Sequence, residues 1–157
     1  MKKIFFLLLP ALFIGCVTIK MPETIQEDFV YKKVFNADFE ESIKAATATL
    51  EDFGWKVADI SRSKLIKQDR TLDKNTIYLA YIFTEIKQAQ LFLTSSYSTF
   101  NVRVEPIDDA HTEIAIRYLS VVPIPPFYNK KIDYKNDKLV EKIYLRIEDN
   151  LKKEGSS

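Results

Sequence analysis

This 157-residue chain is poor in the residues that build most small reactive sites. It has one Cys, one His and three Gly. A single Cys closes no intramolecular disulfide, and with a single His it cannot build a Cys/His zinc site. Three Gly leave no room for a glycine-rich loop that cradles a phosphate group. The composition therefore excludes a disulfide scaffold, a zinc module and the common nucleotide-binding motifs.

An excess of charge of one sign is missing as well. The 23 Lys and Arg nearly balance the 22 Asp and Glu, which gives a formal net charge of +1 at pH 7. Such a chain generates no long-range field that would gather a polyanion, so we expect no nucleic-acid partner. The length is that of one ordinary domain.

The chain does have one long apolar run, at its N-terminus. Two lysines at positions 2 and 3 precede the apolar residues 4–14, and Gly15 and Cys16 follow them. This order is typical of an export signal. Eleven helical residues span only ~16 Å, about half of a bilayer core, so the run is too short for a transmembrane anchor.

Residues 13–16 (FIGC) resemble the lipobox of bacterial lipoproteins, although Phe13 stands where Leu is commonest in that family. The resemblance implies that a diacylglycerol is attached to the thiol of Cys16 and that the signal is cut between Gly15 and Cys16. With Val17 after the cysteine, the chain is similar to the lipoproteins that are sorted to the outer membrane and face the periplasm. The alternative is an ordinary secretory signal with a chance cysteine.

These features divide the chain into three parts: a signal peptide (1–15), a lipidated Cys16 with a short tether (16–28), and one extracytoplasmic domain (29–154). The tether has no sustained periodicity. Its twelve residues after Cys16 extend at most ~40 Å, so the domain is expected to stay close to the bilayer.

Within the domain, hydrophobic periodicity predicts a helix after a first strand at 29–35. Asp38 and Glu41 have the spacing of a capping box, an apolar stripe recurs every three to four residues, and Gly54 stands where a helix C-terminus is expected. A second helix of about fifteen residues is predicted near the C-terminus, capped by Asn136 or Asp137.

Between the helices, alternating apolar and polar residues predict strands. We expect strands at 55–60 and 65–68 with a turn between them, then at 76–85, 100–106 and 112–122. Residues 86–99 are ambiguous. The prolines in 123–129 are expected to end the sheet, because they remove hydrogen-bond donors.

The predicted order is β-α-β-β-β-β-β-α, an α+β fold whose antiparallel sheet has about five to six strands and whose two helices cover its apolar face. A helix-grip architecture, with the sheet curled around the C-terminal helix, fits this order. The alternative is a ferredoxin-like split βαβ fold, which needs fewer strands between its helices.

A second resemblance concerns residues 39–68, in which a helix that ends Phe53-Gly54-Trp55 is followed by a strand and a polar turn. Together with the hairpin over 100–118, this run resembles BamC-like (NlpB-like) periplasmic lipoprotein domains. The resemblance implies a helix-grip fold and a non-enzymatic role at an envelope complex. BamC-like proteins carry two such domains, whereas this chain has room for one, and no functional residue of that family maps onto this sequence.

Reactive constellations are scarce. The carboxylate pairs Glu40/Glu41 and Asp108/Asp109 stand where a helix start and a hairpin turn favour acidic residues, and His111 lies beside a turn without a motif-marked nucleophile. The hydroxyls of residues 94–99 have no catalytic context. We therefore expect no enzyme activity, no metal site and no cofactor other than the covalent lipid.

Candidate binding residues lie in two apolar segments. Ile124, Phe127 and Tyr128 belong to the proline-stiffened loop, which would lose little entropy on binding. Leu91 and Phe92 lie in the ambiguous segment. The alternatives are that Phe127 and Tyr128 cover the core and that Leu91 and Phe92 belong to an edge strand. Lys130 and Lys131 are candidate contacts for anionic headgroups.

Two functions fit these features. The first is a membrane-anchored envelope lipoprotein that acts as a non-catalytic interaction or assembly module for a protein partner. The second is a carrier of a lipid or another hydrophobic ligand, with a cavity between the sheet and the C-terminal helix. The residues expected to line that cavity are Tyr81, Phe83, Phe100 and Tyr144.

Overall fold

A computed structural model describes residues 29–66, 76–90, 95–124 and 129–154 of the chain. It has an α+β fold in which two helices accompany a seven-stranded antiparallel sheet. In chain order the elements are β1 (Tyr31–Phe35), α1 (Phe39–Asp52), β2 (Val57–Ile66), β3 (Thr76–Thr84), β4 (Lys87–Gln90), β5 (Ser95–Pro106), β6 (Thr112–Ile124), β7 (Asn129–Asp133) and α2 (Asp137–Glu154).

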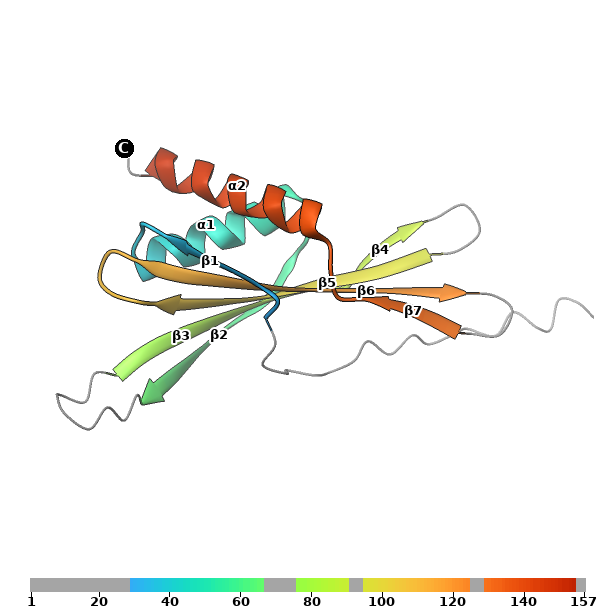
Figure 1. The fold of residues 1–157 in the computed structure, drawn as a ribbon, viewed down its shortest axis with the longest axis horizontal. Helices are drawn as coiled ribbons and strands as arrows, with labels where there is room; N and C mark the ends of the chain where they lie inside the picture. Colours follow the sequence, from blue (N-terminus) through green and yellow to red (C-terminus); the bar gives the residue numbers. More distant parts are fainter. Residues whose placement is uncertain (1–28, 67–75, 91–94, 125–128, 155–157) are drawn as a thin grey trace, which may run out of the picture.

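The two long strands β5 and β6 form the centre of the sheet. The strand order is β1-β6-β5-β3-β2, with β4 added to β5 and β7 added to β6. Strand β1 pairs with residues 112–116 of β6 and β7 with residues 120–124, so β1 and β7 follow one another along the same edge of β6. Figure 1 shows that the part of the sheet formed by β4, β5, β6 and β7 extends beyond the helices.

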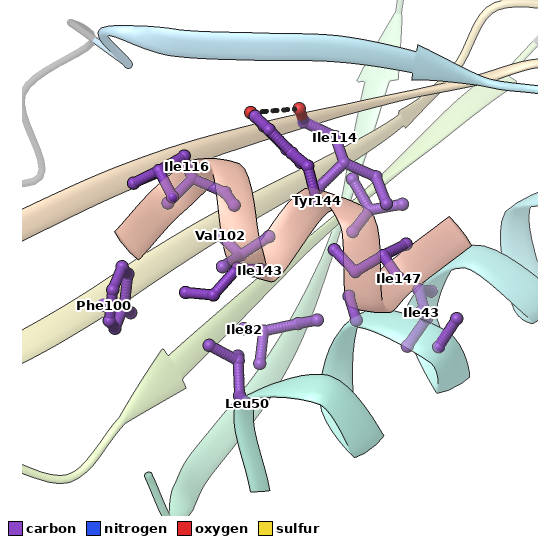
Figure 2. Close-up of a cluster of buried hydrophobic side chains, with 14 of the residues drawn as sticks. Ile43, Leu50, Ile82, Phe100, Val102, Ile114, Ile116, Ile143, Tyr144 and Ile147 are labelled. Atoms are coloured by element: carbon purple, nitrogen blue, oxygen red, sulfur yellow. Dashed lines mark hydrogen bonds between the residues drawn. The ribbon is translucent and has the colours of Figure 1, made fainter. Parts of the chain in front are cut away.

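Both helices lie on the same face of the sheet and pack beside each other (Figure 1). Their apolar stripes meet the inward-facing residues of the strands in one core, whose central members are fully buried. Figure 2 shows these side chains pointing toward one another from α1, α2 and the strands. The core includes Ile43, Leu50, Ile82, Phe100, Val102, Ile114, Ile116, Ile143 and Ile147.

The α+β prediction with an antiparallel sheet and two helices is confirmed. The ferredoxin-like alternative is wrong, because six strands lie between the two helices. The helix-grip prediction expected the sheet to curl around the C-terminal helix. In the structure α2 shares its face of the sheet with α1.

The prediction of two short strands at 55–60 and 65–68 is wrong. Residues 57–66 form the single strand β2, which pairs with β3 along its length and has one register shift between Val57 and Asp59. Because β2 is an edge strand, its polar residues Ser61 and Arg62 are exposed to solvent and do not mark a turn.

The sheet also continues past the point where the prolines were expected to end it. Strand β6 extends to Ile124, and β7 returns beside it with Pro123 opposite Lys130. The register with β5 stops at Val121, so Pro123 interrupts no pairing with that central strand. The ambiguous segment 86–99 contains β4 and the polar start of β5, which pair with each other.

Both ends of α1 follow the expected capping chemistry. The Asp38 carboxylate accepts a hydrogen bond from the Glu41 amide (2.8 Å), as the capping-box spacing predicts. At the other end, Gly54 adopts a left-handed conformation (φ 77°) and its amide donates to the Glu51 carbonyl (2.8 Å). The Trp55 amide donates to the Leu50 carbonyl (3.0 Å), which completes a Schellman motif. At the start of α2, Asn136 provides the cap through its side-chain oxygen.

Substitution of Gly54 tests this helix end. Gly54→Ala is expected to lower the free energy of unfolding by ~1–2 kcal/mol, because an L residue is strained at positive φ. The added Cβ would also lie 3.1 Å from Nζ of Lys87, which donates to the Phe53 carbonyl. Urea denaturation measures the loss. Gly54→Asn is the control, since asparagine tolerates this conformation better; equal stability of all three proteins would contradict the assignment.

Candidate functional site

Most of the residues predicted to bind a partner fall outside the described part of the chain. Leu91, Phe92, Phe127 and Tyr128 all lie there, as do Gly15 and Cys16 of the predicted cleavage and lipidation site, and Ile124 is the last residue of β6. Because Tyr97 pairs with Val121, the start of β5 and the end of β6 lie at the same end of the sheet. Ile124, the one described member of the two predicted apolar segments, therefore lies at the same end of the sheet as the start of β5.

The four residues predicted to line a ligand cavity do not lie together, so that prediction is wrong. Phe100 and Tyr144 belong to the core on the helix side, where the Tyr144 hydroxyl donates to the Ile114 carbonyl (3.1 Å; Figure 2). Tyr81 and Phe83 stack on each other on the opposite face, with ring centroids 6.3 Å apart. Between the sheet and α2, the space is filled by buried side chains such as Phe100 and Ile143.

The predicted carboxylate pairs serve local structure. Glu40 accepts two hydrogen bonds from the Arg62 guanidinium (2.8 and 2.9 Å), which joins α1 to β2. Asp108 accepts from the Ala110 amide and bonds to Nδ1 of His111 (2.7 Å) within an exposed hairpin turn. The Ala110 hydrogen bond, aided by His111, lowers the pKa of Asp108. Among the described residues, no group of three or more His, Cys, Asp or Glu is arranged to hold a metal ion.

A different site emerges along the line where the edge strand β1 faces α2. Two adjoining hollows lie there, with volumes of ≈ 420 Å³ and ≈ 340 Å³. We call them together the β1/α2 groove. The larger is lined by Val34, Phe35, Asn36, Glu148, Leu151 and Lys152. The smaller is lined by Tyr31, Lys33, Asp137, Val140, Glu141, Tyr144 and Leu145.

An ion pair between β1 and α2 lies where the two hollows meet. Nζ of Lys33 is 2.7 Å from Oε1 of Glu148, and it lies 5.5 and 5.8 Å from the ring centroids of Phe35 and Tyr144. The hydrogen bond from Lys33 lowers the pKa of Glu148. At pH values above the ordinary pKa of a glutamate, the ion pair therefore stabilises the contact between β1 and α2. This contribution to stability is lost as the pH falls through the lowered pKa of Glu148. About a third of each side chain is exposed, so the contribution is small.

The smaller hollow has a fixed polar end. The Tyr31 hydroxyl donates to Oδ1 of Asp137 (2.6 Å) and accepts from the Asn136 amide (2.9 Å). Burial, aided by Asp137, raises the pKa of Tyr31, so the hydroxyl keeps its proton at neutral pH. These two contacts hold the start of α2 against β1, and Asp137 and Glu141 bring negative charge to this hollow.

An exposed apolar side chain of α2 flanks the groove. Leu145 lines the smaller hollow and is 53% exposed. On one side β1 pairs with β6, and within the described ranges no strand pairs with its other side. The backbone donors and acceptors of that outer edge are thus available beside the two hollows. The groove combines an unpaired strand edge, apolar contacts and charges of both signs.

Sequence reasoning missed this groove because its two sides are a hundred residues apart in the chain. One signal was present: Leu145 lies outside the apolar stripe of α2, which runs through Val140, Ile143, Tyr144 and Ile147. This signal is weak, because single exposed apolar side chains are common on protein surfaces, and Leu145 alone could not have located the groove.

Comparisons with protein-family models, curated proteins and solved structures find no match to this chain. Within the described ranges, neither helix is long and apolar enough to span a bilayer.

Proposed function

We propose that this chain is a lipid-anchored, non-catalytic module of the bacterial cell envelope that binds a protein partner through the β1/α2 groove. The observation that carries the binding role is the pairing of an open strand edge with two adjoining hollows and the exposed side chain of Leu145. Surfaces of this kind, in which apolar contacts have a polar rim, are typical of protein interfaces.

The anchor in this proposal is the diacylglycerol on Cys16, with the domain held at the periplasmic side of the outer membrane. Stable attachment needs more than one acyl chain, which a lipidated cysteine supplies. The first described residue lies away from the groove: the Phe29 ring lies against the guanidinium of Arg103 (5.3 Å), on the sheet face opposite the helices.

The test is co-purification from cross-linked membranes. Leu145→Arg places a long charged side chain at the smaller hollow, and we expect it to weaken partner recovery at least tenfold, as loss of an apolar anchor at an interface does. Ile107→Arg is the matched control, because Ile107 is equally exposed (57%) in the hairpin between β5 and β6.

Three outcomes would count against the proposal. They are the absence of any stoichiometric partner, equal recovery by both variants, and a co-purifying lipid that native mass spectrometry finds in place of a protein. The last would favour the carrier.

A further inference from the structure

We propose that the partner binds as an extended segment that pairs antiparallel with the outer edge of β1 and places alternate side chains in the β1/α2 groove. This inference rests on the proposed function and specifies the chemistry of the partner. An edge strand beside a helix groove is the arrangement to which an extended peptide adds, with backbone hydrogen bonds giving affinity and side-chain pockets giving specificity.

The alternation of β1 determines which residues of the added segment meet the groove. The side chains on the helix side of β1 are Tyr31, Lys33 and Phe35, because Phe35 belongs to the core and the other two pair with core residues of β6. The side chains of Lys32 and Val34 point to the other side. A new strand would lie ~4.8 Å from β1, with its residues directly opposite these five. Residues opposite Tyr31 and Phe35 would enter the smaller and larger hollows, respectively.

The smaller hollow favours a Lys or Arg side chain opposite Tyr31. Its two carboxylates belong to Asp137 and Glu141, while its lysine, Lys33, is already paired with Glu148. The aliphatic stem of a long basic side chain would pack on Tyr144 and Leu145 and leave its charged end beside the carboxylates.

The larger hollow favours an uncharged side chain. Its lining combines Phe35 and Leu151 with Asn36 and with the charged groups Glu148 and Lys152, which have opposite signs. The residue opposite Phe35 would enter this hollow. Tyr31 and Phe35 are four positions apart, ~13.6 Å along a strand, so the basic and the uncharged residue of the partner are also four positions apart.

Lys32 adds a third element of recognition. It is exposed on the other side of β1, and a carboxylate directly opposite it in a neighbouring strand would form a favourable cross-strand pair. In the N-to-C direction of an antiparallel segment, the favoured pattern is an uncharged residue, two variable residues, an acidic residue and a basic residue.

A second copy of this chain fits the edge poorly. If two β1 strands paired antiparallel about Lys33, the lysines of the two copies would lie directly opposite each other, and a shift of one residue toward the N-terminus would place Lys32 opposite Lys33. Like charges in these positions destabilise strand pairing, and lysines on edge strands oppose such association. The charges therefore favour a different polypeptide with an acidic and a basic residue in the stated order.

The experiment selects binders from a phage library of random decapeptides against the full chain in detergent. We expect enriched peptides to contain the uncharged, acidic and basic residues in the stated order and spacing. Exchanging the acidic and basic positions of an enriched peptide should weaken its binding about five- to tenfold. Glu141→Lys should have a similar effect, whereas Asp149→Lys, an equal charge change at another exposed position of α2, should leave binding within twofold.

Amide hydrogen exchange then distinguishes strand addition from other ways of occupying the groove. A peptide paired with the edge should slow exchange of β1 amides that point away from β6, because they gain hydrogen-bond partners. Enrichment of unrelated patterns, equal binding to Glu141→Lys and Asp149→Lys, or unchanged exchange in β1 would overturn the inference. If Leu145→Arg still abolished partner recovery from membranes, the proposed function would stand while strand addition failed.

Discussion

Replacement of Cys16 by alanine is expected to abolish lipidation and leave the chain as a precursor that retains residues 1–15. The thiol is the group to which the diacylglycerol would be attached, and no other cysteine in the chain could replace it. Labelled palmitate should enter the wild-type protein and be absent from Cys16→Ala. Mass spectrometry should find the wild-type chain cut before Cys16 and lipid-modified, and the variant uncut.

Gly15→Ala provides the matched control. Alanine keeps the small residue that precedes the cysteine in the lipobox pattern, so this variant should be labelled and cut like the wild type. Labelling of Cys16→Ala with palmitate, or removal of its signal before position 16, would show that Cys16 carries no anchor. The chain would then follow the ordinary secretory alternative.

The second large effect concerns the core under α2. Ile143 is fully buried among side chains from both helices and the sheet. Ile143→Ala is expected to lower the free energy of unfolding by ~2–5 kcal/mol, because the lost apolar contacts leave a cavity that close-packed neighbours fill only in part. A fall in the midpoint of thermal unfolding of at least about 8 °C should follow.

Leu145→Ala is the matched control on the same helix. It removes a side chain of equal size that is 53% exposed, so its effect should stay within about 0.5 kcal/mol. Similar losses in the two variants would contradict the placement of α2. Tolerance of Ile143→Ala would point to a loosely packed space between sheet and helix, which the carrier function requires.

Both helices could be predicted from the sequence because their signals are local. Asp38 and Gly54 stand at the ends of an apolar stripe with helical spacing, and the capping bonds form between residues three to five positions apart. The β5–β6 hairpin could also be predicted from the sequence, since Phe100, Val102 and Val104 alternate with polar residues and are buried.

Edge strands were harder to predict because solvent exposure removes the apolar pattern. The exposed polar residues Ser61 and Arg62 led to the prediction of a turn where β2 continues. The four residues of β4 include no large apolar side chain. Their strand conformation depends on pairing with β3 and β5, which no local pattern records.

The candidate site depends even more on long-range pairing. The groove exists because β1 pairs with β6 and because Tyr31 holds the start of α2 beside it, contacts that join residues 77 to 106 positions apart. Sequence patterns identified Tyr144 as an apolar member of the α2 stripe. They could not show that β1 would be left at the sheet edge, with Lys33 reaching across to Glu148.

Site-specific photo-crosslinking in intact cells tests whether the anchored domain binds a partner through the β1/α2 groove. A photoreactive amino acid replaces Leu145 in the full lipidated chain, and a second protein carries it at Ile107, which is equally exposed elsewhere. We expect position 145 to capture one defined envelope protein and position 107 to capture none, with the product lost in a Cys16→Ala background. Capture of the same proteins from both positions, or of no protein from position 145, would contradict the proposed role.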